Sequence, residues 1–372
     1  MSRFSRRTDF DPTPNAWTRA RAAHPARHDL TLSNPTRAAL PYDAAAVARA
    51  LADPAALTYA PHPFGLPAAR AAVAAALDVD PARVVLTAST SEAYGWLFKL
   101  LCDAGDDVLA PAPSYPLFDH LAAFEGVALR SYRLRYTGAW EVDAATLTPG
   151  RRTRAALIVN PNNPTGNYLH ATDLASLRAL DLPLICDEVF APFALSAPDA
   201  DRVPTLAHAT TGLAFVLGGL SKWAGLPQMK LGWIVVAGAP ARVAQALERL
   251  ELIADTYLSV SAPVQHAAAA LLGGPTQAAI AARVRANLAT LRSAVAGTAV
   301  EVPRVEGGWY ALLRLPAVRD DEAWARRFLR EAGVLVQPGW FYDLEGGPYV
   351  VVSLLPPEGD FAAGVEALLG CV

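Results

Sequence analysis

Short apolar, β-branched runs alternate along the first 260 residues with longer segments whose apolar positions recur at helical spacing. Runs of the first kind predict strands, and segments of the second kind predict helices. Strands are predicted at 84–87, 107–110, 127–134, 155–160, 183–186, 214–217 and 232–237. Helices are predicted at 43–53, 67–77, 91–102, 115–125, 171–180 and 240–258. Because strands alternate with helices, we expect an α/β fold with a mainly parallel seven-stranded sheet flanked by helices.

The pattern differs at both ends of the chain. Residues 1–44 hold five prolines and predict an N-terminal arm, with at most one short helix at 14–24, that joins a smaller domain. Residues 45–260 then form a large domain. Residues 261–372 begin with a helix-rich stretch and continue into strands near 309–315 and 348–355, separated by a helix at 320–332. This second pattern predicts a smaller α+β domain at the C-terminus.

Composition and charge exclude several classes of partner. The 372 residues carry a net charge of −3, so no basic surface favours nucleic acid or an anionic membrane. The three cysteines, Cys102, Cys186 and Cys371, are odd in number and too far apart for a metal site or a disulfide framework. The early arginines Arg3, Arg6 and Arg7 precede no apolar segment, and no stretch approaches the roughly 20 apolar residues of a membrane span. We expect a soluble, cytoplasmic protein that holds no metal.

Polar residues follow three of the predicted strands. Asn163 lies just past the strand at 155–160, Asp187 directly follows the strand at 183–186, and Lys222 lies shortly after the strand at 214–217. Parallel sheets bind ligands at the carboxyl ends of their strands, so we expect the three side chains to share one site. Taken singly, each has an ordinary alternative as a turn asparagine, a helix-capping aspartate or a surface lysine.

Three motifs surround these residues, namely Asn160-Pro-Asn-Asn-Pro-Thr-Gly166, Asp187-Glu-Val-Phe190 and Gly218-Gly-Leu-Ser-Lys222. In this order they resemble the site of the fold-type I aminotransferases of class I and II, which depend on pyridoxal 5'-phosphate (PLP). The resemblance implies that Lys222 binds the cofactor aldehyde as a Schiff base and moves the proton of the substrate Cα. It implies that Asp187 keeps the pyridine nitrogen protonated and that Asn163 donates to the phenolic oxygen.

The resemblance covers nearly the whole chain, from Asn34 to Gly339, and implies further cofactor contacts. Hydroxyl and amide groups of Ser89, Thr90 and Ser91 are expected to hold the phosphate at a helix N-terminus, although Ser89 and Glu92 also match a simple capping box. The other expected cofactor residues are Tyr115 on the ring, Gly219 and Lys230 near the phosphate, Phe190 where most relatives have Tyr, and Tyr59. Tyr59 matches a residue that reaches the neighbouring subunit's phosphate, which implies a homodimer with shared sites.

The chain departs from the family where an arginine usually binds the substrate α-carboxylate. The segment Tyr349-Val-Val351-Val-Ser353 places Val351 at that position, and a valine cannot pair with a carboxylate. Either another residue supplies the cation, with Arg304 and Arg314 as the nearest candidates, or the substrate has no free α-carboxylate. We favour the second hypothesis, with an amine, amino sugar, amino alcohol or carrier-bound amino acid as the substrate.

The sequence therefore predicts a PLP-dependent aminotransferase that moves an amino group between an amine or amino acid and a keto or aldehyde acceptor. A PLP-dependent lyase or decarboxylase on the same fold is the alternative, since the outcome depends on which Cα bond the site aligns with the cofactor. A degenerate PLP-binding protein without activity is a third possibility.

Overall fold

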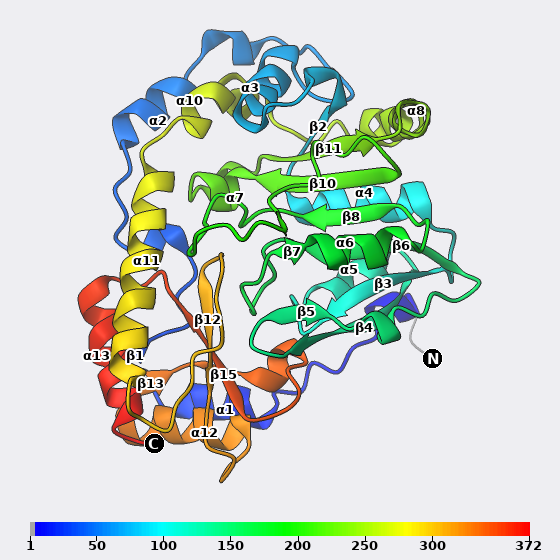
Figure 1. Ribbon diagram of the computed structural model, residues 1–372. Coiled ribbons are helices and arrows are strands. Elements are labelled where there is room, and N and C mark those ends of the chain that lie inside the picture. The colour runs from blue at the N-terminus through cyan, green and yellow to red at the C-terminus, as the bar shows by residue number, and fades with distance from the viewer. Residues whose placement is uncertain (1–3) are drawn as a thin grey trace.

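The computed structural model describes residues 4–372, so Arg3 of the N-terminal arginine cluster lies outside the described residues. Within them, the largest sheet has eight strands (Figure 1). Their spatial order is β2 (Val84–Thr87), β11 (Gly232–Gly238), β10 (Leu213–Gly219), β8 (Leu184–Asp187), β6 (Thr153–Val159), β3 (Asp107–Ala112), β4 (Ala128–Tyr136) and β5 (Trp140–Val142). The predicted α/β class is confirmed, with one strand more than expected.

The central strands β10, β8, β6, β3 and β4 run parallel. Strand β11 is antiparallel to both β10 and β2, and β5 is antiparallel to β4. The additional strand β5 has only three residues, which is too short for a hydrophobic period to reveal it. It pairs with β4 because the chain reverses around Gly138, whose φ of 102° is readily adopted only by glycine.

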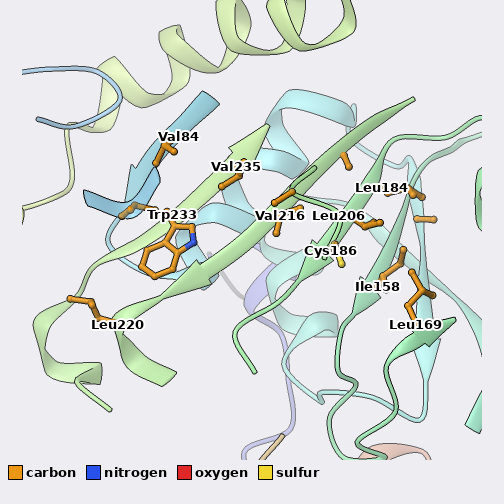
Figure 2. Close-up of a cluster of buried hydrophobic side chains, with 14 of the residues drawn as sticks. Val84, Ile158, Leu169, Leu184, Cys186, Leu206, Val216, Leu220, Trp233 and Val235 are labelled. Carbon is orange, nitrogen blue, oxygen red and sulfur yellow. The ribbon is translucent and has the colours of Figure 1, made fainter. Parts of the chain in front are cut away.

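Helices cover both faces of this sheet. One face packs against α4 (Thr90–Leu101), α5 (Phe118–Phe124) and α8 (Pro240–Tyr257), and the other packs against α3 (Pro67–Leu77) and α6 (Ala171–Arg178). Successive side chains of a strand point to opposite faces. Ile185 therefore joins the first core, while Leu184 and Cys186 join the second. Figure 2 shows part of the second core, in which Val84, Ile158, Val216 and Val235 belong to the same cluster as Leu184 and Cys186.

A second body of structure surrounds a three-stranded sheet of β12 (Tyr310–Arg314), β15 (Tyr349–Ser353) and β14 (Gln337–Pro338). Its separate core includes Trp309, Trp324 and Phe361. The helices around it are α1 (Ala16–Ala23), α11 (Thr276–Val295), α12 (Asp321–Arg327) and α13 (Glu358–Leu369). Helix α12 continues through a π-helical turn at Phe328–Ala332, so the helix predicted at 320–332 is present with a change of pitch.

The N-terminal segment joins this second body. Strand β1 (His28–Asp29) pairs in parallel with β13 (Val334–Leu335), and Trp17 of α1 lies in the same core. The domain limits predicted at 44/45 and 260/261 stay predictions. The shorter helices are α2 (Ala44–Leu51), α7 (Leu220–Trp223), α9 (Ala262–His266) and α10 (Ala268–Leu272). Strand β7 (Leu169–His170) pairs with β9 (Arg202–Val203). None of the helices in the described part of the chain combines the length and apolarity that crossing a bilayer requires.

Candidate active site

A cavity of about 230 Å³ lies at the carboxyl edge of the large sheet, and Asn163, Asp187 and Lys222 all line it. The strand register explains this convergence. Val159 at the end of β6 pairs with Asp187 at the end of β8, and Leu217 of β10 pairs with Asp187 from the other side. Three polar groups that are dispersed over 60 residues therefore face one space, as expected for parallel strands.

Lys222 stands on the short helix α7, which follows β10 directly. Its Nζ lies 5.6 Å from the ring centroid of Phe190 and 5.0 Å from that of Trp309. Burial lowers the pKa of Lys222 to about 8, although the negative charge of Asp187 opposes this shift. The aromatic surroundings thus leave a nucleophilic, partly neutral amine at the cavity wall.

Asp187 is held by two hydrogen bonds. Its Oδ1 accepts from the backbone N–H of Val189 at 3.1 Å, and its Oδ2 accepts from the Tyr94 hydroxyl at 2.9 Å. Burial raises the pKa of Asp187 to about 6, against the lowering effect of these bonds and of Lys222. Sequence reasoning did not identify Tyr94, although it lies one helical turn after the expected phosphate residue Thr90.

The N-terminus of α4 forms another wall, through Ser89 and Thr90. Ser89 caps the helix, because its Oγ accepts from the Glu92 N–H at 3.2 Å, and Glu92 Oε2 accepts from the Ala88 N–H at 2.6 Å. The capping interaction and the placement of Ser89 at the cavity are therefore both present. Gly219 lines the same region, where an added Cβ would stand 3.2 Å from the backbone of Gly232.

Asn163 and the rings of Tyr115 and Phe190 complete the expected set inside the cavity. Oδ1 of Asn163 is buried and has no hydrogen-bond partner among residues 4–372. Sequence reasoning also did not identify Ser33, which lines the cavity together with Tyr310. Burial raises the pKa of Tyr310, and the nearby Ser33 side chain opposes this shift.

The loop that carries Asn163 is attached to the segment 305–307. The N–H groups of Glu306 and Gly307 donate to the Gly166 carbonyl at 2.9 and 2.8 Å. Glu306 is 1% exposed, and its carboxylate accepts from the Tyr168 N–H at 2.9 Å and lies 2.9 Å from the Arg304 guanidinium. Gly166 has a φ of 72°, and a Cβ there would come within 2.9 Å of the Gly307 carbonyl oxygen, so this contact requires glycine.

Three expected cofactor residues lie outside the cavity lining: Ser91, Lys230 and Tyr59. Ser91 and Lys230 are exposed. Tyr59 is 82% exposed and borders a separate cavity of about 590 Å³, between residues 55–66 and 258–266. Their roles stay predictions.

Neither arginine suggested for a substrate carboxylate faces the cavity. Arg304 pairs with Asp199 and Glu306, and Arg314 pairs with Glu301 at 3.5 Å. Val351 is 1% exposed and pairs with Leu312 and Gln337 inside the smaller sheet. Among the described residues that line the cavity, Lys222 is the single basic side chain.

Comparisons with known proteins agree on one family. The model of "Aminotransferase class I and II" matches residues 29–348. An alanine aminotransferase of Mycobacterium bovis is 28% identical over 306 residues, which cover 78% of this chain and 70% of the relative. A glutamate-pyruvate aminotransferase of Escherichia coli strain K12 is 26% identical over 300 residues, covering 76% of this chain and 73% of the relative.

Solved structures show the same fold. The structure of an aminotransferase from Escherichia coli superimposes with a TM-score of 0.83 at 22% identity, covering 100% of this chain and 98% of that chain. A variant aspartate aminotransferase of Thermus thermophilus gives a TM-score of 0.82 at 22% identity, with both chains covered completely.

Proposed function

The chain belongs to the class I and II aminotransferases, which are PLP-dependent transferases, and we propose that Lys222, Asp187 and Asn163 carry its reaction. The observation that carries this proposal is the position of Lys222, partly buried and with a pKa near 8, in one cavity with Asp187. An amine base, a buried carboxylate and an unpartnered amide in one enclosed space match the requirements of amino-group transfer.

The residues of the cavity fit PLP. Oδ1 of Asn163 is a buried acceptor without a partner among residues 4–372, so it has the capacity to accept a hydrogen bond from a polar ligand. Ser89 and Thr90 place hydroxyls at the positive end of α4, where a phosphate is favoured. Gly219 and Gly232 keep the adjoining wall free of side chains, since a Cβ on Gly232 would stand 3.0 Å from Thr87 Oγ1.

When bound, PLP supplies an electron-accepting ring that weakens the bonds around the amine-bearing carbon of the donor. Asp187 would stabilise positive charge at the ring nitrogen, because it is an ionised carboxylate above a pKa of about 6. In its neutral form, Nζ of Lys222 would accept the proton from the donor carbon and would donate it to the former aldehyde carbon of the cofactor. The rings of Phe190 and Trp309 lie beside Nζ and shield it in part from water.

The amino donor of this proposal has no free α-carboxylate. This is supported by a cavity lining with no arginine and by the engagement of Arg304 and Arg314 with other carboxylates. The hydroxyls of Ser33 and Tyr310, which both line the cavity, offer neutral hydrogen-bonding groups instead. They suit a hydroxyl or carboxamide next to the amine-bearing carbon.

The working form of this proposal is a homodimer in which Tyr59 completes the partner's site. Support comes from the apolar side chains around Tyr59, since Leu57 is 92%, Tyr257 49% and Leu258 39% exposed. Large exposed apolar surfaces usually mark contacts between proteins. A cytoplasmic location is also part of the proposal, and the free thiols of Cys102, Cys186 and Cys371 favour a reducing compartment.

The visible absorbance of the purified holoenzyme tests these assignments. Alanine, alaninamide and alaninol share a methyl side chain and differ in the group beside the amine. We expect the absorbance of the bound cofactor to be bleached faster by alaninol and alaninamide than by alanine. Lys222→Ala abolishes this response, whereas Lys99→Ala, a surface lysine paired with Glu125, leaves it unchanged.

Two outcomes contradict the proposal at different points. A Lys222→Ala variant that still responds like the parent protein refutes the role of the lysine. A faster, saturable response to alanine than to alaninol refutes the assignment of a donor without a carboxylate, and leaves the role of Lys222 intact.

A further inference from the structure

Helix α4 contacts both ends of the cavity. Its first turn brings Ser89 and Thr90 to the lining, and one turn later Tyr94 reaches Asp187 on β8. Thr90 and Tyr94 are four residues apart, so they lie on the same face of the helix. One rigid element therefore bridges the hydroxyls at one end of the cavity and the carboxylate at the other.

We propose that Tyr94 is a positioning residue, whose hydroxyl orients the Asp187 carboxylate and holds it in the ionised form that the cofactor ring nitrogen requires. The inference rests on the proposed function of Asp187. Its geometric basis is the 2.9 Å hydrogen bond between two groups that are 2% and 7% exposed.

The hydroxyl is the informative part of the side chain. The ring of Tyr94 packs edge-on against Phe118 and close to Phe98, and a phenylalanine would make the same contacts. A buried hydroxyl is costly unless it finds a partner, and the partner of this one is Asp187. The Tyr94 hydroxyl donates to Oδ2 of Asp187, and the Val189 N–H donates to Oδ1. Each oxygen of the carboxylate is therefore held by one donor.

Several other charged or titratable groups act on Asp187, but in a different way. Lys222 lowers its pKa through charge, while the sequence neighbours Cys186 and Glu188 and the wall residue Tyr115 interact with it only electrostatically. The thiol of Cys186 donates to Glu188. Tyr94 is thus the one side chain, among the described residues, that is hydrogen-bonded to this carboxylate.

The direction of the effect follows from the bond. A donor to the charged form lowers the pKa of a carboxylate, so its removal raises that pKa. Cofactor affinity that depends on ionised Asp187 is present above this pKa and is lost as the pH falls through it. In Tyr94→Phe we therefore expect the loss to begin at higher pH, by about one pH unit for a hydrogen bond to a charged acceptor.

The experiment measures the dissociation constant of PLP from the apoprotein between pH 5 and pH 8.5, by quenching of tryptophan fluorescence. The protonation of PLP itself and of Lys222 affects every variant equally, so the difference between proteins reports on Asp187. Tyr132→Phe is the matched control. Tyr132 is equally buried, and its hydroxyl donates to the Leu157 carbonyl at 2.9 Å, away from the carboxylate.

We expect the midpoint of PLP binding to shift upward in Tyr94→Phe alone, with a lower kcat and a similar KM. An unchanged midpoint in Tyr94→Phe, or an equal shift in Tyr132→Phe, overturns the inference and assigns Tyr94 a packing role. Failure of the parent protein to bind PLP at any pH refutes the proposed function instead, so the two failures are distinguishable.

Discussion

Glu306 provides the sharpest test of how the active-site loop is held. Its carboxylate accepts from the Tyr168 N–H at 2.9 Å, lies 2.9 Å from the Arg304 guanidinium and lies 3.3 Å from His170 Nε2. Replacing it in Glu306→Gln keeps the shape of the side chain and removes the charge. One of its two oxygens becomes an NH₂ group that faces donors on both sides.

The magnitude follows from burial and from the number of bonds. A hydrogen bond to a charged group contributes about 1.5–3 kcal/mol, and breaking a buried ion pair costs about 3–5 kcal/mol. Because Arg304 is 39% exposed and keeps Asp199 as a partner, the loss of the Arg304–Glu306 ion pair costs less than breaking a fully buried pair. We expect Glu306→Gln to lower the free energy of unfolding by about 2–3 kcal/mol.

Equilibrium unfolding of the apoprotein in urea, followed by tryptophan fluorescence, measures this change. Glu301→Gln is the matched control, since it breaks a Glu–Arg pair whose side chains are 73% and 47% exposed. An exposed pair contributes little, so the control should change stability by less than about 0.5 kcal/mol. Equal effects of the two variants would refute the argument that burial makes the Glu306 contacts strong.

A second readout connects the same variant to the site. The Gly166 carbonyl, held by the Glu306 and Gly307 N–H groups, closes the loop that carries Asn163. A weakened attachment lets this loop move, so we expect PLP affinity to fall roughly tenfold in Glu306→Gln, which corresponds to about 1.4 kcal/mol. Unchanged affinity in a destabilised variant would show that the loop is positioned without Glu306.

Three further predictions concern the cavity itself. In the apoprotein, amine-specific labelling of Lys222, followed by mass spectrometry, should rise with a midpoint near pH 8; a midpoint near the ordinary value of about 10.5 would contradict its burial. Mixing inactive Tyr59→Ala and Lys222→Ala chains should restore activity, because one site of each mixed dimer then holds both native residues; no recovery, despite mixed dimers seen by native mass spectrometry, would refute a shared site. Tyr310→Phe should raise the KM for alaninol roughly tenfold, about 1.4 kcal/mol, with a smaller change for alanine; equal changes would remove its hydroxyl from donor recognition.

The periodic pattern was a reliable guide to elements whose apolar residues are continuous. Strand β8 and helix α4 begin within one residue of their predicted limits. Side chains are buried regularly along both elements, so the hydrophobic period is visible over their whole length. The three-residue strand β5 and the two-residue pairing of β1 with β13 were not predicted. Their formation depends on partners far away in the chain, and segments of two or three residues are too short to show a hydrophobic period.

The sequence alone predicted that Asn163, Asp187 and Lys222 lie together, because each follows a strand and parallel strands end at one edge, and all three line one cavity. It did not determine what surrounds them. The bond from Tyr94 to Asp187 joins residues 93 positions apart, and the Glu306 contact with Tyr168 joins residues 138 apart. Such contacts depend on the register of the strands and on the packing of α4 against the sheet. Only the tertiary structure brings these groups to hydrogen-bonding distance, and burial then shifts the pKa values on which the chemistry depends.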